Sequence, residues 1–221
     1  MKERFTVKRE AARLAGDARL GRTPQLRARA RRFRKEHPDL KDEQLAALLD
    51  ALWHHSALGA RTLSMELMRA WKKPVHLFER RDFERWRSSL CGWWDTDDLG
   101  LNLLGPWVAS DQKKRLVYLT SLARSPHLWS RRLALVATVP INRGALGPTI
   151  PELTLRLVEG AKHECEPMIV KSISWALREL SKRHHALTAT YLQRNASSLP
   201  ALARREVLNK LRTGSKSGKA K

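Results

Sequence analysis

The stretch TPQLRARARRFRKEHP, residues 23–38, decides the fold class of this chain. Its apolar residues Leu26, Ala30 and Phe33 recur every three or four positions, which is the period of one face of an α-helix. The opening Thr-Pro pair is typical of a helix start, and a residue before proline, as in the closing His-Pro pair, is disfavoured in a helix. The stretch therefore predicts one short amphipathic helix with defined ends.

The same helical period continues along the chain, and no stretch alternates apolar and polar residues as a half-buried strand would. Short breaks rich in Pro, Gly, Ser or His separate the periodic segments. We therefore predict an all-α protein. The further helices are expected at Asp42–His54, Leu58–Trp71, Phe78–Leu90, Trp94–Leu104, Pro106–Arg124, Leu128–Val139, Ile150–Lys162, Pro167–Lys182, His185–Asn195 and Pro200–Leu211.

About a dozen short helices in sequence indicate stacked pairs, at intervals close to the roughly 40-residue period of HEAT-type repeats. No repeated sequence signature accompanies this period. We expect a HEAT-like or ARM-type helical repeat solenoid over residues 1–213, followed by a basic, disordered tail at 214–221. A solenoid presents a long concave face, and a basic concave face would follow a nucleic-acid backbone.

The charge balance points to a polyanionic partner. Lys and Arg number 43 against 22 Asp and Glu, which gives a net charge of +21 and an isoelectric point near 11.0. Nucleic acid is the first expectation, and an anionic membrane surface is the alternative. No segment approaches the roughly 18 apolar residues that span a bilayer, and we expect no signal peptide and a cytoplasmic protein.

The cysteines and histidines predict no metal site. Cys91 and Cys165 lie far apart without a Cys-x-x-Cys spacing. The histidine pairs at 54–55 and 184–185 are adjacent in sequence, so their rings would point about 100° apart on a helix. We therefore expect no metal, no cofactor, a reducing compartment and a monomer.

The helix predicted at residues 23–36 carries more positive charge than its few acidic residues can neutralise. A helix that is merely solvated would interleave the two signs. We expect phosphate contacts from some of its basic residues, which are Arg27, Arg29, Arg31, Arg32, Arg34 and Lys35.

The stretch GWWDTDD, residues 92–98, places an indole and a carboxylate four residues apart. Trp94 and Asp98 would share one helical face, so an aromatic ring and a negative charge would lie together in a basic protein. The alternative is ordinary: a core tryptophan, and an aspartate that caps its helix. Asp97 points about 100° away from Asp98 and is not expected to be its partner.

Three further motifs complete a pattern that resembles the AlkD family of DNA alkylation-repair glycosylases, which are built of HEAT-like repeats. The motifs are WSRR at 129–132, KSISWALRE at 171–179 and Arg204-Arg205-Glu206, in addition to WWDTxD. The resemblance extends from the turn at residues 20–24 to the last helix. Two positions depart from it: Ala12 stands where the family has an aromatic residue, and Gly59 where related sequences often have glutamate.

The resemblance implies an enzyme that removes cationic alkylated purines, such as N3-methyladenine and N7-methylguanine, from double-stranded DNA without flipping the base into a pocket. It assigns the two site tryptophans to Trp94 and Trp175, the catalytic aspartate to Asp98, and an active-site arginine, expected to hold a phosphate, to Arg132. The basic residues expected to contact DNA are Arg27, Arg31, Arg131, Lys171, Arg178, Arg204 and Arg205.

These residue types suit the chemistry. An alkylated purine is already cationic and a good leaving group, so the enzyme must mainly stabilise the positive charge that grows on the deoxyribose and position a water. One carboxylate serves both needs, and indole faces favour nearby positive charge. Three alternatives stay open: a non-catalytic HEAT-like binder of branched or damaged DNA, a protein-interaction solenoid, which the charge disfavours, and binding of ribosomal RNA.

Overall fold

The computed structural model describes residues 5–19, 21–72 and 75–219, and every regular element in these ranges is a helix. The prediction of an all-α protein is therefore confirmed. The chain forms two compact units, residues 1–90 and residues 91–221. The single domain expected over residues 1–213 stays a prediction, as does the concave face expected of it. No helix within the described ranges is long and apolar enough to cross a membrane.

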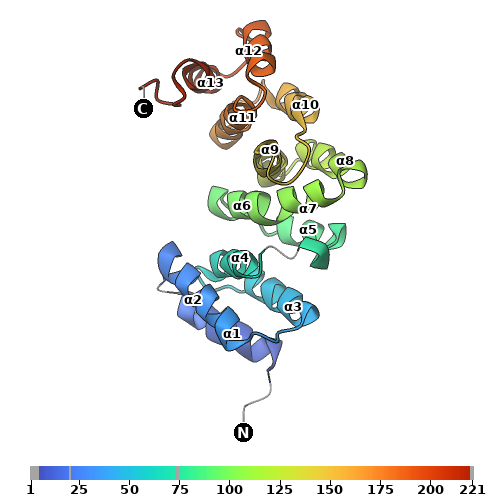
Figure 1. The fold of residues 1–221 in the computed structure, drawn as a ribbon, viewed down its shortest axis with the longest axis vertical. Coiled ribbons are helices and arrows are strands. Elements are labelled where there is room, and N and C mark those ends of the chain that lie inside the picture. The colour runs from blue at the N-terminus through green and yellow to red at the C-terminus, as the bar shows by residue number, and fades with distance from the viewer. Residues whose placement is uncertain (1–4, 20, 73–74, 220–221) are drawn as a thin grey trace. The chain divides into compact units, whose positions relative to one another are not determined.

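Within residues 5–19, 21–72 and 75–90, the first unit has five α-helices and a short 3-10 helix; the α-helices are labelled in Figure 1. Helix α4 packs against α2 and α3, and α1 packs against α3. Each helix buries its apolar face on a neighbour, as the periodicity predicts. Helix α1 was not predicted from the sequence. The elements are α1 (Val7–Ala18), α2 (Thr23–Glu36), α3 (Asp42–Trp53), α4 (Ala60–Ala70), η1 (Val75–Leu77) and α5 (Arg80–Arg87).

Two stacked tryptophans form part of the core of the first unit. The rings of Trp53 and Trp86 are 4.8 Å apart and nearly parallel. Trp53 Nε1 donates to the Trp86 carbonyl at 3.2 Å and to Ser89 Oγ at 3.1 Å, and Trp86 Nε1 donates to Asp50 at 2.6 Å. Buried indole N–H groups need such partners. These two tryptophans are therefore structural.

The two departures from the family pattern both lie in the first unit. Gly59 has φ +83°, and a Cβ added there would come within 2.7 Å of the Ala18 carbonyl oxygen. This position therefore excludes glutamate and favours glycine, which adopts positive φ at little cost. Ala12 lies exposed on α1, so an aromatic side chain at this position is not needed for the core.

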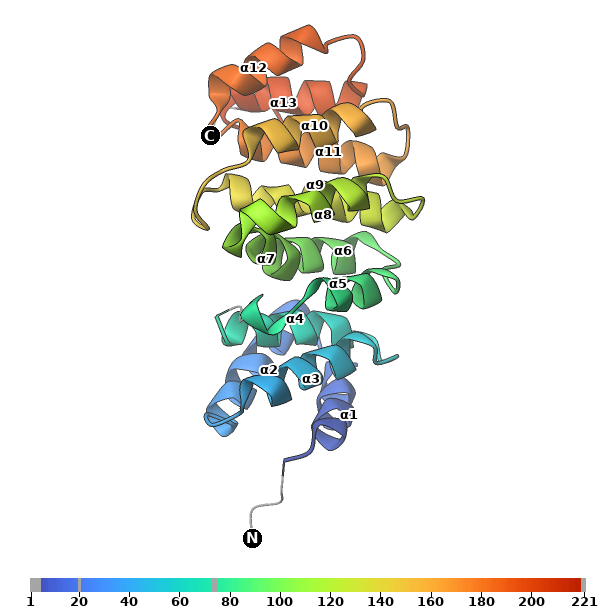
Figure 2. The same ribbon diagram turned by 90° about the vertical axis from the view of Figure 1, so that its right-hand side faces the viewer.

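The second unit arranges its helices in two rows. Helix α9 packs against α6, α7, α8 and α11, and α11 packs against α13, so α9, α11 and α13 form an inner row. Helices α8, α10 and α12 lie over them and face the viewer in Figure 2. The bounds are α6 (Trp93–Leu99), a π-helix η2 (Gly100–Leu104), α7 (Gly105–Ser110), α8 (Gln112–Ala123), α9 (Leu128–Asn142), α10 (Pro151–Ala161), α11 (Pro167–Leu180), α12 (His185–Arg194) and α13 (Ala201–Thr213).

Two predicted boundaries are wrong. Helical structure runs without a break from α6 through η2 into α7, although a break at Gly105 was expected to separate a helix ending at Leu104 from one beginning at Pro106. A proline costs a helix one hydrogen bond, and a π turn before it is one way to accommodate the interruption. The single helix predicted at Pro106–Arg124 instead ends at Ser110, because Asp111 leaves helical geometry and caps α8 by accepting from the Lys114 N–H at 3.4 Å.

The described part of the C-terminal segment, residues 214–219, turns back along α13. Gly214 adopts φ +73°, and its N–H donates to the Lys210 carbonyl at 3.0 Å. Asn209 Nδ2 then donates to the Lys216 carbonyl at 3.1 Å. The disorder expected of residues 214–221 in solution stays a prediction, whereas the structure gives residues 214–219 a definite hydrogen-bonded turn.

Candidate functional site

The start of α6 is capped by Asp95 and not by Asp98. The Asp95 carboxylate is buried and accepts from three backbone N–H groups, those of Cys91 at 3.2 Å, Gly92 at 3.1 Å and Thr96 at 2.8 Å. Gly92 is the residue before the first helical residue, Trp93, and a side chain three residues after such a cap commonly accepts from its N–H. The ordinary explanation of Asp98 as a helix cap is therefore not needed, since another carboxylate fills that role.

Trp94 is a surface residue. The residue is 50% exposed, and the neighbouring Trp93 is 53% exposed. The Trp94 ring lies back over Gly92, because a Cβ added at Gly92 would come within 2.3 to 2.6 Å of three atoms of the ring. Core tryptophans are largely buried, so Trp94 is not a core residue. Large aromatic side chains that lie exposed are typical of a binding surface.

Asp98 is held by a buried amide. Asn102 is 6% exposed, and its Nδ2 lies 2.9 Å from the Asp98 carbonyl oxygen and 3.3 Å from the Asp98 carboxylate. Asn102 belongs to the π-helix η2, and π turns inserted into helices are frequent at functional sites. The amide restricts the orientation of Asp98, whose side chain is partly exposed.

Arg132, on α9, binds Asp97 rather than standing free for a phosphate. Its Nε and Nη2 donate to the two Asp97 carboxylate oxygens at 2.9 and 2.8 Å, and Nη1 donates to the Met168 carbonyl at 2.5 Å. The side chain is only 5% exposed. Burial raises the pKa of Asp97, an effect that the hydrogen bonds and charge of Arg132 oppose. The pair therefore fixes α6 against α9 directly beside Asp98.

Trp175 lines a cavity of about 470 Å³ formed by α9, α11, α13 and the C-terminal turn. Arg178, one turn later, donates to Ser174 Oγ at 3.1 Å and lies 3.5 Å from the Glu206 carboxylate. Burial lowers the pKa of Arg178, while Glu206 and Glu179 oppose that shift. The cavity is lined by Arg132, Lys171, Trp175, Arg178, Leu202, Glu206 and Lys216.

Arg132 therefore connects the two halves of the predicted site. It lines the cavity that contains Trp175, and it holds Asp97, the residue before Asp98. Three of the four residues that the resemblance assigned, Asp98, Arg132 and Trp175, are linked in this way, and Trp94 lies on the same helix as Asp98. The phosphate contact expected of Arg132 is untested, and the three acceptors that its guanidinium already has favour a positioning role for Arg132 instead.

The basic residues expected to contact DNA differ in whether an internal acceptor already engages them. Arg131 pairs with Glu164 at 2.9 Å, and Arg27 pairs with the buried Glu66 at 3.2 Å, so both have internal acceptors. Arg204 donates to the Ala196 carbonyl at 2.7 Å but remains exposed. The side chains of Arg31, Lys171 and Arg205 are exposed, and no ion pair engages them within the described ranges.

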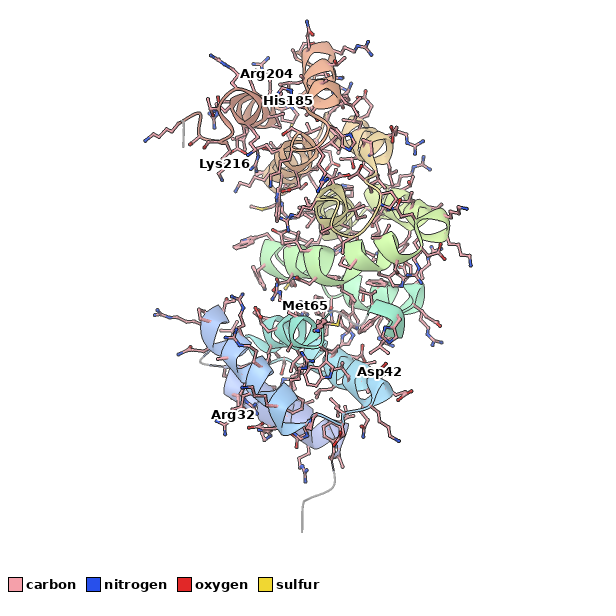
Figure 3. The ribbon with its side chains drawn as sticks, in the orientation of Figure 1. Arg32, Asp42, Met65, His185, Arg204 and Lys216 are labelled. Atoms are coloured by element: carbon pink, nitrogen blue, oxygen red, sulfur yellow. The ribbon has the colours of Figure 1, made fainter. Side chains whose placement is uncertain are left out.

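In the first unit, α2 and α4 border a second basic cavity, of about 310 Å³. Arg34 donates to the Ala70 carbonyl there and lies 6.0 Å from the centre of the Trp71 ring. Figure 3 shows Arg32 on the same helix, α2. The cavity is lined by Arg27, Arg31, Arg34, Glu66, Arg69, Ala70 and Lys72.

Sequence reasoning missed three residues of the second unit that the structure brings to the site. Asn102 could have been found, because it follows Asp98 at the same four-residue spacing that joined Trp94 to Asp98. Asp97 was set aside because it points away from Asp98, and that direction is what takes it to Arg132. Lys216 carried no signal, because it lies in the segment expected to be a tail.

The fold and the site define an all-helical repeat protein with a basic cavity lined by tryptophan. The chain belongs to the DNA alkylation repair enzyme family, whose model matches residues 15–211. DNA is the partner that this family implies. No curated protein matches the sequence.

Solved structures share the fold. A predicted DNA alkylation repair enzyme from Enterococcus faecalis has a TM-score of 0.70 at 19% identity, over 94% of this chain and 95% of that one. AlkD2 from Streptococcus mutans has a TM-score of 0.62 at 20% identity, over 85% and 89% of the two chains. These likenesses concern the helical repeat architecture.

Proposed function

We propose that this protein is a monofunctional DNA N-glycosylase that hydrolyses the N-glycosidic bond of cationic alkylated purines, such as N3-methyladenine and N7-methylguanine. One observation carries the proposal: α6 presents a half-exposed indole, Trp94, and a partly exposed carboxylate, Asp98, while Asp95 caps the helix. Membership of a DNA alkylation repair family supplies the substrate class.

The reaction needs one carboxylate, because the leaving group is already activated. The electron pair of the glycosidic bond leaves with the purine and neutralises its charge, while positive charge grows on the deoxyribose. The oxygen of a water molecule then bonds to C1′, and Asp98 accepts the proton that this water releases. A carboxylate about 4 Å from a unit charge, at an effective dielectric near 20, stabilises it by roughly 4 kcal/mol, which corresponds to about three decades in rate.

The neighbouring residues position this carboxylate. Asn102 fixes the orientation of Asp98, and the Arg132–Asp97 pair holds the helix that carries it. The indole faces of Trp94 and Trp175 pack against the sugar and favour its cationic character. Because Trp94 lies on the surface, the lesion is attacked where the duplex rests on the protein, without extrusion of the base into a pocket.

The reaction uses only water and side chains, so the proposal includes no metal and no cofactor. We also propose that the protein acts as a monomer in the cytoplasm, because a net charge of +21 opposes self-association and favours a polyanion. The phosphate contacts that we propose come first from the exposed residues Arg31, Lys171 and Arg205, and then from Arg178 and Arg204. Arg27 and Arg131 would contact DNA only in addition to their internal carboxylates.

The test is release of free base from a duplex that contains a single N7-methylguanine. The protein is incubated in excess over the duplex, and the released base and the abasic site are measured against the spontaneous rate. We expect release well above that rate and none from the undamaged duplex. Binding without release, together with a preference for branched DNA, would instead support a non-catalytic DNA binder.

A further inference from the structure

We infer that the C-terminal turn, residues 214–219, is part of the nucleic-acid binding site and that Lys216 binds a backbone phosphate beside Trp175. The inference rests on the proposed function. It concerns a segment that lies beyond the family match, which ends at residue 211. Three observations support it: the way the turn is built, the place it gives Lys216, and the charges around that place.

The turn is held by specific contacts. Gly214 takes φ +73°, a conformation that L-residues with side chains rarely adopt, and so reverses the chain after α13. Asn209 Nδ2 donates to the Lys216 carbonyl at 3.1 Å. Gly218 closes over the same amide, because an added Cβ would come within 3.2 to 3.3 Å of the Asn209 side chain. Asn209 is therefore the residue around which the segment folds back.

This turn brings Lys216 to the cavity that contains Trp175. Lys216 lines that cavity of about 470 Å³ and also the adjoining one of about 340 Å³, and Trp175 and Arg178 border both. In Figure 3, Lys216 lies on the segment after α13, on the side of α11. A residue 41 positions after Trp175 thus reaches the same site (216 − 175).

The charges of the cavity leave two cations for an external anion. Arg132 is paired with Asp97, and Arg178 lies 3.5 Å from Glu206, which is the carboxylate in the lining. The other two cations of the lining, Lys171 and Lys216, have no ion pair with any residue that the structure describes. An ammonium group is a strong point donor to phosphate, so the two lysines favour a phosphate between them.

The experiment compares Lys216→Ala with Lys219→Ala in the full chain. Lys219 is exposed on the same segment and does not line either cavity, so both variants lose one positive charge. A third variant, Asn209→Ala, keeps every charge and removes the amide that holds the turn. Affinity for an undamaged duplex is measured at several salt concentrations, with inorganic phosphate as a competitor in a second arm.

One phosphate contact adds about 0.9 to the log–log salt dependence, so the affinity deficit of Lys216→Ala should be about threefold larger at 50 mM than at 200 mM salt. Asn209→Ala should move in the same direction, and Lys219→Ala should stay near wild type. Equal effects of the two lysine variants would overturn the inference. The inference would also be overturned if millimolar inorganic phosphate removed the difference in DNA affinity between the two lysine variants. That result would indicate a site for free phosphate and not for a backbone phosphate. A wild-type protein that binds no DNA at all would overturn the proposed function instead.

Discussion

Arg132 binds Asp97 through two parallel hydrogen bonds, of 2.9 and 2.8 Å, one residue before the proposed catalytic Asp98. The pair is largely buried and joins α9 to α6. It gives an arginine that sequence comparison would assign to DNA a different task, which is to hold the helix that carries the carboxylate.

Arg132→Ala should destabilise the fold and slow base release, while leaving the salt dependence of DNA binding unchanged. Removing one partner of a buried ion pair costs about 3–5 kcal/mol. Urea unfolding measures the loss, and a binding titration measures the salt dependence. Arg131→Ala is the matched control, because it removes the same charge from the adjacent position, which pairs with Glu164. An unchanged stability, with a salt slope reduced by about 0.9, would assign Arg132 to a phosphate.

Asp97 should make the stability of the protein depend on pH. Burial raises its pKa above the ordinary value of 3.8 in the folded state. Between the ordinary pKa, which the unfolded state keeps, and the raised pKa of the folded state, the folded protein binds more protons than the unfolded one. The free energy of unfolding therefore falls as pH rises through this window. Wild type should therefore gain stability relative to Asp97→Asn as pH is lowered toward 3.8. A difference between the two proteins that is flat, or grows toward neutral pH, contradicts the shift.

Asn102→Ala should lower the single-turnover rate of base release without changing affinity for undamaged duplex. The side chain touches Asp98 and is itself buried, so it positions the carboxylate without reaching DNA. Loss of a buried hydrogen bond costs about 1–3 kcal/mol. A thermal melt therefore accompanies the assay, to confirm that the variant is still folded at the assay temperature. Asn102→Asp adds a like charge beside Asp98 and should be slower still. A rate equal to that of wild type in Asn102→Ala would remove Asn102 from the site.

Gly92→Ala should impair base release by displacing Trp94. The backbone at Gly92 is extended, with φ −157°, so alanine is not strained there, but its Cβ would meet the Trp94 ring. Gly160→Ala is the control: this helical glycine has nothing within 4 Å of an added Cβ, so the change should stabilise α10 by roughly 0.5–1 kcal/mol. Trp94 fluorescence cannot be isolated among the eight tryptophans, so release of N7-methylguanine is the measurement. Full activity in Gly92→Ala would show that the position of the Trp94 ring over Gly92 is not needed for base release.

The sequence predicted the all-helical class because the signals of helix formation are local. The Thr-Pro start and the apolar spacing of residues 23–36 predict α2 to within one residue, because amphipathic burial acts within a few positions. The cap expected at Thr23 is wrong, since Arg22 is the cap and its N–H donates to the Gln25 side chain. The prediction from the sequence also failed at residues 99–111, where a π turn carries the helix through Pro106 and Asp111 breaks it later. The π turn packs against α9, which spacing along the chain does not encode. The break at Asp111 is local, since its side chain accepts from the Lys114 N–H.

In the candidate site, too, local features could be predicted from the sequence and long-range contacts could not. The spacing of Trp94 and Asp98 is local and was read correctly as one helical face, but no local pattern separates an exposed indole such as Trp94 from a core indole such as Trp53. The partners of Arg132, Asp97 and Met168, lie 35 and 36 positions away, and become its neighbours only through the stacking of α6, α9 and α11. Lys216 meets Trp175 only because the C-terminal turn folds back to the cavity. Long-range ion pairs therefore decided which basic residues remain available for DNA.

The most direct test of the account is the single-turnover release of N7-methylguanine by Asp98→Asn. Asparagine keeps the shape of the side chain and removes the charge that stabilises the cationic sugar. The rate should fall by about two to three decades, while affinity for lesion DNA stays level or rises, because one negative charge facing a polyanion is lost. Release within a factor of about three of wild type, where two to three decades are expected, would contradict the role of Asp98 and with it the proposed mechanism.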